Sequence, residues 1–217
     1  MSNTTCNIAI LISGSGSNLQ SFIDQVQSAE LKANISVVIS NKPDVRGLQR
    51  AHSAGISTEV IEHKLYGSRE EFDLALVKTL DKYPVDLVIL AGFMRILTPV
   101  FIQPYQGRLL NIHPSLLPKY PGLNTHQRAL DAGDTATGAT VHFVTEELDG
   151  GPPIVQTQVP IQAGDNAEVL AAKVLKQEHI IYPLAASWFA ENRLRLENGK
   201  GYLDDQPIPE TGILLGN

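Results

Sequence analysis

Residues 6–18 read CNIAILISGSGSN, and this stretch indicates the fold class. Its first eight residues form a short apolar run, typical of a strand that is buried in a sheet. The run ends in a glycine turn, residues 14–18, after which apolar residues recur at helical spacing as far as Val26. A strand, a glycine turn and a helix in this order predict the first unit of an α/β sheet.

The same alternation of strand and helix continues to residue 113. Further strands are predicted at 35–40, 58–61, 86–91 and 109–113, with helices at 45–54, from Ser68 to just before Pro84, and at 98–105. Ser68 and Glu71 have the spacing of a capping box. The run at 86–91 is nearly all apolar, which favours a strand covered on both faces and therefore a parallel sheet.

The pattern changes after Pro114. Strands are predicted at 140–144 and 154–159, and because no helix separates them they are expected to pair antiparallel. A long helix over 166–193 follows, with a possible kink at Pro183, and the last twenty or so residues receive no assignment. The predicted fold class is α/β, a doubly wound, mostly parallel sheet with an antiparallel C-terminal portion, in a single domain over residues 1–217.

Composition excludes several classes of protein. The 217 residues are 43% hydrophobic and 18% charged, as in an ordinary globular domain. The formal charge of −6 argues against broad nucleic-acid binding, and no apolar run approaches the roughly 20 residues of a membrane span. One cysteine, Cys6, excludes an internal disulfide and a cysteine-rich zinc site. With a polar start at residues 1–5 that does not resemble a secretory leader, we expect a cytoplasmic protein.

The glycine turn is the first candidate binding site. Backbone N–H groups at a helix N-terminus bind anions, and Ser15, Ser17 and Asn18 add side-chain donors. A dinucleotide fingerprint would need a third glycine where Leu19 stands, and a phosphate-loop lysine is missing. A monophosphate therefore suits the turn best, and a tight turn without a ligand remains the alternative.

Asn111 and His113 are the candidates for chemistry. Two residues apart on a strand, they face the same way, and together they could polarise a carbonyl and stabilise an oxyanion. Asp149 lies in a loop that could bring a carboxylate to His113, which would favour the charged imidazolium. The alternatives are a satisfied polar strand end and an ordinary turn aspartate. His126, His142 and His179 could also approach a site, whereas the spacings of a metal site are missing and none is expected.

Residues 110–120, LNIHPSLLPKY, resemble the signature of the folate-dependent formyltransferases. Matching segments stand in the family's order at 13–20, 91–97, 141–144, 147–152 and 177–179, so the resemblance covers about residues 8–190. It implies a Rossmann-like formyltransferase fold and a branch that formylates glycinamide ribonucleotide in purine biosynthesis. The glycine turn has Ser15 where some relatives have Asn, which leaves the phosphate prediction unchanged because backbone N–H groups carry it.

The resemblance also implies a role for each matching residue. The catalytic residues are Asn111, His113 and Asp149. The ribonucleotide would be bound by Gly16, Ser17, Asn18, Leu175, Lys176, Gln177 and Glu178. The folate would be bound by Arg69, Met94, Arg95, Ile96, Leu97, Asn111, Thr145, Glu146, Glu147, Leu148 and Asp149. Residues 1–110 would form the nucleotide and phosphate half, and residues 111–217 the catalytic and folate half.

The implied reaction is a direct attack of the substrate amine on the formyl carbon of 10-formyltetrahydrofolate. Asn111 and protonated His113 would hold the oxyanion, while Asp149 keeps the histidine charged and orders a water that carries the proton. The folate is then a consumed co-substrate, and no tightly bound cofactor or metal is implied. The partners are small molecules, without nucleic acid or membrane, and the protein is expected to be a monomer or weak homodimer.

Three alternatives stay open at this point. Formyltransferases acting on initiator tRNA and formyltetrahydrofolate deformylases share the His-Pro-Ser-Leu-Leu-Pro stretch at residues 113–118. The first carry an additional C-terminal domain and the second an additional N-terminal domain, for which this chain shows no length. The third alternative is a non-catalytic nucleotide-binding module on the same fold, because a fold alone does not define a function.

Overall fold

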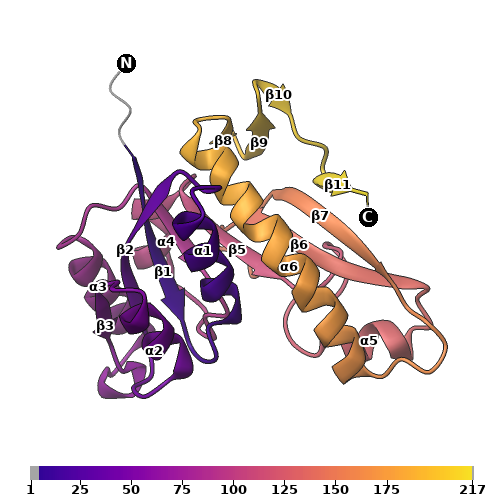
Figure 1. The fold of residues 1–217 in the computed structure, drawn as a ribbon, viewed down its shortest axis with the longest axis horizontal. Helices are drawn as coiled ribbons and strands as arrows, with labels where there is room; N and C mark the ends of the chain where they lie inside the picture. The colour runs from indigo at the N-terminus through magenta and orange to yellow at the C-terminus, as the bar shows by residue number, and fades with distance from the viewer. Residues whose placement is uncertain (1–4, 217) are drawn as a thin grey trace.

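One eight-stranded sheet runs through the protein in the order β3-β2-β1-β4-β5-β6-β7-β11 (Figure 1). The structure is a computed structural model and describes residues 5–216, so most of the polar start at residues 1–5 lies outside it. The strands are β1 (Cys6–Ile12), β2 (Ala33–Ser40), β3 (Thr58–Val60), β4 (Leu87–Leu90), β5 (Leu109–His113), β6 (Ala136–Phe143), β7 (Pro153–Pro160) and β11 (Ile213–Leu215). The first five are parallel, and β6 is antiparallel to both β5 and β7. This order confirms the predicted fold class.

Helices cover both faces of this sheet. Helices α1 (Ser17–Gln27), α2 (Arg46–Ser53) and α6 (Ala167–Ala190) share one hydrophobic cluster. Helices α3 (Arg69–Leu80) and α4 (Pro99–Ile102) share the cluster on the other face. The short helices η1 (His63–Leu65) and η2 (Gln103–Tyr105) precede α3 and follow α4 in the chain. Ile8 and Ile10 of β1 point into the first cluster and Ala9 and Leu11 into the second, all fully buried. Burial on both faces explains why this strand has no polar alternation.

The second half of the chain differs in detail from the prediction. Strand β6 begins at Ala136, four residues before the predicted start. Helix α5 (Thr125–Asp131) was not predicted, because the proline-rich sequence around it has no long helical period. Helix α6 continues through Pro183 and ends at Ala190, where the prediction ran to 193. The unassigned end forms β8 (Leu194–Glu197), β9 (Lys200–Leu203) and β10 (Gln206–Pro207), a small antiparallel sheet, and then β11.

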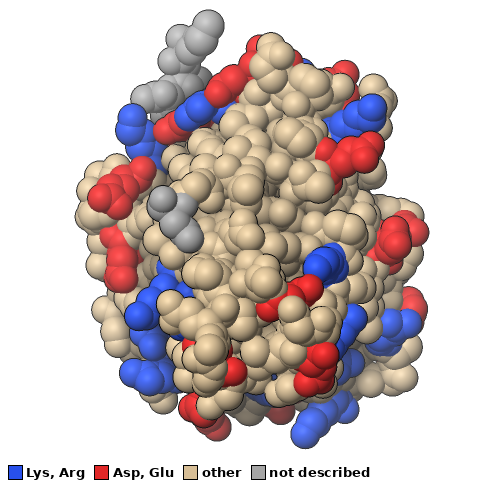
Figure 2. Space-filling view, turned by 90° about the vertical axis from the view of Figure 1, so that its right-hand side faces the viewer, with Lys and Arg blue, Asp and Glu red and all other residues tan. Residues whose placement is uncertain are grey.

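The surface agrees with the charge argument. Figure 2 shows Lys and Arg side chains next to Asp and Glu around the rim of one face, with an uncharged centre. On that face the described residues form no broad basic patch of the kind that nonspecific nucleic-acid binding needs. Across residues 5–216, no helix has both the length and the apolar character needed to cross a bilayer.

The connection from β6 to β7, residues 144–152, turns tightly at Gly151. A Cβ atom on Gly151 would collide with the backbone carbonyl oxygen of Phe143, which neither strand can move away. A Cβ atom on Gly150 would meet only the exposed side chain of Glu147. Residue 151 therefore needs to be glycine for this connection to close, whereas residue 150 does not.

We expect Gly151→Ala to lower the free energy of unfolding by about 1–3 kcal/mol, the usual cost of forcing an extra carbon into a packed site. Gly150→Ala is the matched control, and its loss should be much smaller because the Glu147 side chain can rotate away. Urea unfolding of both variants measures the difference. Equal stability of the two would contradict the steric argument.

Candidate active site

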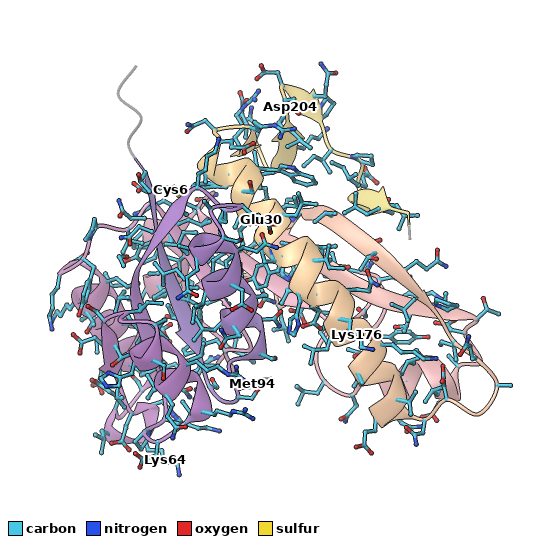
Figure 3. All side chains as sticks on the ribbon, in the orientation of Figure 1. Cys6, Glu30, Lys64, Met94, Lys176 and Asp204 are labelled. Carbon is cyan, nitrogen blue, oxygen red and sulfur yellow. The ribbon has the colours of Figure 1, made fainter. Side chains whose placement is uncertain are left out.

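The carboxyl ends of β1, β4 and β5 meet at one edge of the sheet, and the candidate site lies there. Ser13 follows β1, and His113 ends β5. Figure 3 shows Met94 at this lower edge of the sheet and Lys176 on α6. Ligands of open α/β sheets bind outside the carboxyl ends of the strands, in the crevice between the loops that follow them.

The glycine turn is held by α2. The N–H of Gly47 donates to the carbonyl of Gly14 at 3.0 Å, and the Arg50 Nε–H donates to the carbonyl of Ser15 at 3.0 Å. Gly16 has φ 69°, and a Cβ atom there would lie 2.6 Å from the Cα of Gly47. With its carbonyls turned towards α2, the turn leaves the N–H groups of the first turn of α1 directed at the edge of the sheet.

Asn18 and Glu178 bring this turn together with α6. The Asn18 Nδ2–H donates to a Glu178 carboxylate oxygen at 2.7 Å, and both side chains are buried. The amide oxygen of Asn18, Oδ1, is buried without a hydrogen-bond partner. Burial raises the pKa of Glu178, and the hydrogen bond from Asn18 opposes that shift only in part. A buried carboxylate beside an unsatisfied amide oxygen is a place where a polar ligand would be bound.

The other predicted residues of α6 point in different directions. Gln177 accepts a hydrogen bond from the Thr157 hydroxyl of β7 at 3.3 Å, so its side chain is engaged by the sheet. Lys176 is exposed and Leu175 is half-buried. Of the four, Glu178 is the residue that contacts the glycine turn directly in this structure.

His113 lies between two acceptors. Its Nε2 is 2.8 Å from the carbonyl oxygen of Tyr120, and its Nδ1 is 3.4 Å from a carboxylate oxygen of Asp149. A carbonyl and an ionised carboxylate only accept hydrogen bonds, so each ring nitrogen of His113 faces an acceptor. The 3.4 Å distance is long for an N–H···O hydrogen bond. Asp149 also accepts the N–H of Gly122 at 2.8 Å.

His142 completes this group, and sequence reasoning named it only as a histidine that could approach. Its Nδ1 is 2.9 Å from the carbonyl oxygen of Phe143, and burial lowers its pKa to about 4, so it is neutral. Its Nε2 therefore accepts, and the Asn111 Nδ2–H donates to it at 3.1 Å. Asn111 pairs directly with His142 between β5 and β6, so the register of that pair would have revealed the contact.

Two further histidines approach the edge from its sides. Burial lowers the pKa of His126, and the nearby His113 lowers it further. Burial also lowers the pKa of His179, which lies near Asp24 and Arg50 beside the glycine turn. His126 Nδ1 and His179 Nε2 are buried without a hydrogen-bond partner. His52 and His63, by contrast, are distant from these groups in the sequence. The Nδ1 of His63 lies 3.1 Å from the side-chain nitrogen of Asn41.

The residues predicted to bind folate border the same edge. Met94 and Ile96 are 59% and 55% exposed, and Leu148 in the β6–β7 connection is 53% exposed. Arg95 is half-buried and its Nε has no hydrogen-bond partner, while Arg69 is exposed at the start of α3. Gln103 donates to Glu146 at 3.2 Å, which ties the connection to the end of α4. Exposed apolar side chains next to polar groups suit a flat, partly apolar ligand.

Within residues 5–216, no three His, Cys, Asp or Glu side chains lie close enough together to hold a metal ion. The single cysteine, Cys6, is buried, and burial raises its pKa to about 11. A thiol with that pKa is a poor nucleophile at neutral pH.

Comparison with known proteins gives one consistent result. Residues 6–186 match the formyl transferase family. The chain is 53% identical over 206 residues to the phosphoribosylglycinamide formyltransferase of Escherichia coli, which covers 95% of this chain and 97% of that protein. It is 50% identical over 194 residues to the trifunctional purine biosynthetic protein adenosine-3 of Homo sapiens, of which it covers 19%.

Solved structures give the same answer. The phosphoribosylglycinamide formyltransferase of Coxiella burnetii superimposes with a TM-score of 0.94 and 47% identity, over 98% of this chain and all of that one. The glycinamide ribonucleotide transformylase 1 of Symbiobacterium toebii superimposes with a TM-score of 0.90 and 43% identity, over 94% and 95% of the two chains. The likeness therefore extends over nearly the full length of both proteins.

The raised pKa of Glu178 predicts how stability depends on pH. The folded state holds this proton more tightly than the unfolded state, so stability is lost as pH rises from the ordinary value of 4.5 through the folded-state pKa. We expect Glu178→Gln, which carries no charge, to melt a few degrees above the wild type at pH 7. The difference should vanish in acid, where the wild-type carboxyl is protonated.

Thermal denaturation over a pH series measures this effect. Glu30→Gln, which neutralises an exposed carboxylate, is the control and should show no such pH-dependent gain. A Glu178→Gln variant that is less stable than the wild type at pH 7 would mean that the ionised carboxylate stabilises the fold.

Proposed function

The chain belongs to the formyl transferase family, and from this premise we propose that it transfers the formyl group of 10-formyltetrahydrofolate to the amine of glycinamide ribonucleotide. The products are formylglycinamide ribonucleotide and tetrahydrofolate, a step of purine biosynthesis. The relatives of matching length that carry this activity in their names support the proposal. The observation in the site that carries it is the buried His113–Asp149 pair beside Asn111.

The ribonucleotide is bound between the glycine turn and α6. Its phosphate accepts hydrogen bonds from the N–H groups of Gly16, Ser17 and Asn18, where the dipole of α1 favours negative charge. The Glu178 carboxylate, held by Asn18, accepts donors of the sugar or the glycinamide portion. Lys176 and Gln177 contribute less directly, because in this structure one is exposed and the other is bonded to Thr157.

The folate is bound between residues 94–97 and the β6–β7 connection, residues 145–149. Met94, Ile96 and Leu148 supply apolar contacts for a flat ring, and their exposed side chains support this role. Arg69 and Arg95 supply positive charge for the anionic end of the folate. The formyl group then lies near Asn111 and His113.

The chemistry needs a direct attack and a stabilised oxyanion. The substrate amine adds to the formyl carbon, and the negative charge that develops on the oxygen is met by an Asn111 N–H and by the His113 imidazolium. Asp149 stabilises the imidazolium, and a water beside it passes the proton from the amine to the leaving nitrogen of the folate. No covalent intermediate forms on the enzyme, in keeping with the high pKa of Cys6.

Several finer expectations belong to the same proposal. The folate is a consumed co-substrate, and no metal or tightly bound cofactor takes part. Residues 1–217 act as one domain, which the continuous eight-stranded sheet supports. The division into a phosphate half over 1–110 and a folate half over 111–217 stays a prediction. We also propose that the protein works in the cytoplasm as a monomer or weak homodimer.

Formyl transfer tests the function directly. With 10-formyltetrahydrofolate as donor, we expect release of deformylated folate that requires glycinamide ribonucleotide. The amount released should equal the formylated ribonucleotide formed, because every formyl group is transferred. Equal release without the ribonucleotide would make the protein a deformylase. Folate binding without release in either condition would make it a binding module.

Variants test the catalytic roles. We expect His113→Ala and Asp149→Ala to fold and to lose at least about a hundredfold in kcat, because each weakens stabilisation of the oxyanion. Asp165→Asn is the matched control: it removes a carboxylate that pairs with Lys173 at 2.7 Å before α6, and its kcat should stay near the wild-type value. Near wild-type turnover of either alanine variant would remove that residue from the mechanism.

A further inference from the structure

We propose that Ser13 and Asp73 are positioning residues that anchor the two ends of the folate segment, which we define as residues 94–98. This inference rests on the proposed function, and it assigns a role to two buried side chains that the reaction itself does not use. One lies at the end of β1 and the other on α3, so they reach the segment from opposite sides.

Ser13 anchors the first end. Its side chain is 4% exposed, and its hydroxyl oxygen accepts the N–H of Met94 at 2.7 Å. The residues are 81 positions apart in the chain, so this is a tertiary contact and not a local turn. Ser13 also directly precedes the glycine turn. The folate segment is therefore tied to the strand that carries the predicted phosphate site, which sets the distance between the two substrates.

Asp73 anchors the second end. It lies inside α3, is 1% exposed, and accepts the N–H of Thr98 at 2.6 Å. Thr98 is the residue before α4, and its own side chain does not cap that helix. A carboxylate is expensive to bury, and burial raises the pKa of Asp73. An exposed side chain could cap the start of α4 at lower cost, so the buried carboxylate points to a demand for an exact backbone position.

The segment between these anchors has no regular secondary structure. Residues 91–98 form neither helix nor strand, and Gly92 has φ 69°, which only glycine adopts easily. Met94 and Ile96 are mostly exposed, so within the segment the apolar side chain that packs in the core is that of Leu97. A segment of this kind would lose conformational freedom on binding, and anchoring it beforehand removes that cost from the affinity. The anchors should thus affect folate binding and leave the chemical step alone.

Steady-state kinetics separates these effects. We expect Ser13→Ala and Asp73→Leu to raise the KM for 10-formyltetrahydrofolate about tenfold each, the size expected when a backbone donor loses a strong acceptor. The KM for glycinamide ribonucleotide and kcat at saturating folate should stay within about twofold. Asp73→Asn should restore most of the affinity, because its amide oxygen can still accept the Thr98 N–H.

Two controls match these changes. Ser36→Ala removes a half-buried hydroxyl that donates to Ile8 within the sheet, away from the segment. Asp165→Asn removes a carboxylate that accepts a backbone N–H, that of Gln162 at 2.9 Å, outside the site. Both should keep the wild-type KM for folate. Should Asp73→Leu fail to fold, Ser13→Ala and Asp73→Asn still test the two anchors.

Amide hydrogen exchange tests the anchors without turnover. The N–H groups of Met94 and Thr98 should exchange faster in Ser13→Ala and in Asp73→Leu respectively, while strand amides of β4 stay protected. Unchanged exchange at both positions, or a loss in kcat with no change in the folate KM, would overturn the inference. A wild-type protein without ribonucleotide-dependent transfer would instead overturn the proposed function, while the exchange experiment would still decide whether the anchors exist.

Discussion

Burial of the central strands on both faces is the constraint on which the rest of the structure depends. Strand β1 has helices on each side, and from Ile8 to Ile12 none of its side chains is exposed. The polar groups of the glycine turn and of the His113 site follow the places where such strands end. Because the first five strands are parallel, several of those ends lie at the same edge, and the chemistry of the protein is concentrated there.

Helix α6 connects the two halves of that edge. Tyr182 is fully buried on this helix, and its hydroxyl lies 3.0 Å from the carbonyl oxygen of Leu90 and 2.9 Å from that of Leu110. It therefore contacts β4 and β5 just before their polar ends. One turn earlier, Glu178 meets Asn18 of α1. A single helix thus contacts both the predicted ribonucleotide site and the strand that carries Asn111 and His113.

The two histidines of the site contact different neighbours. His113 faces the carbonyl oxygen of Tyr120 and the carboxylate of Asp149, whereas His142, whose side chain is 2% exposed, is neutral and accepts from Asn111. Asp149 lies between them, 3.4 Å from one ring and 3.9 Å from the other. The neutral His142 gives the Asn111 amide a fixed orientation, and the Asp149 carboxylate faces the Nδ1 of His113.

The sequence by itself determined the class of the fold, the order of strands and helices through residue 113, and the polar residues at the strand ends. Those features depend on local period and on glycine chemistry, which a single chain displays directly. Helix α5 and the small C-terminal sheet were not predicted, because their residues show no hydrophobic period of their own. Only the tertiary structure decided that Asp149 reaches both His113 and His142, or that Asn18 meets a residue 160 positions away. Contacts of that kind depend on strand register and helix packing, which arise from the whole core at once and leave no signal in any one segment.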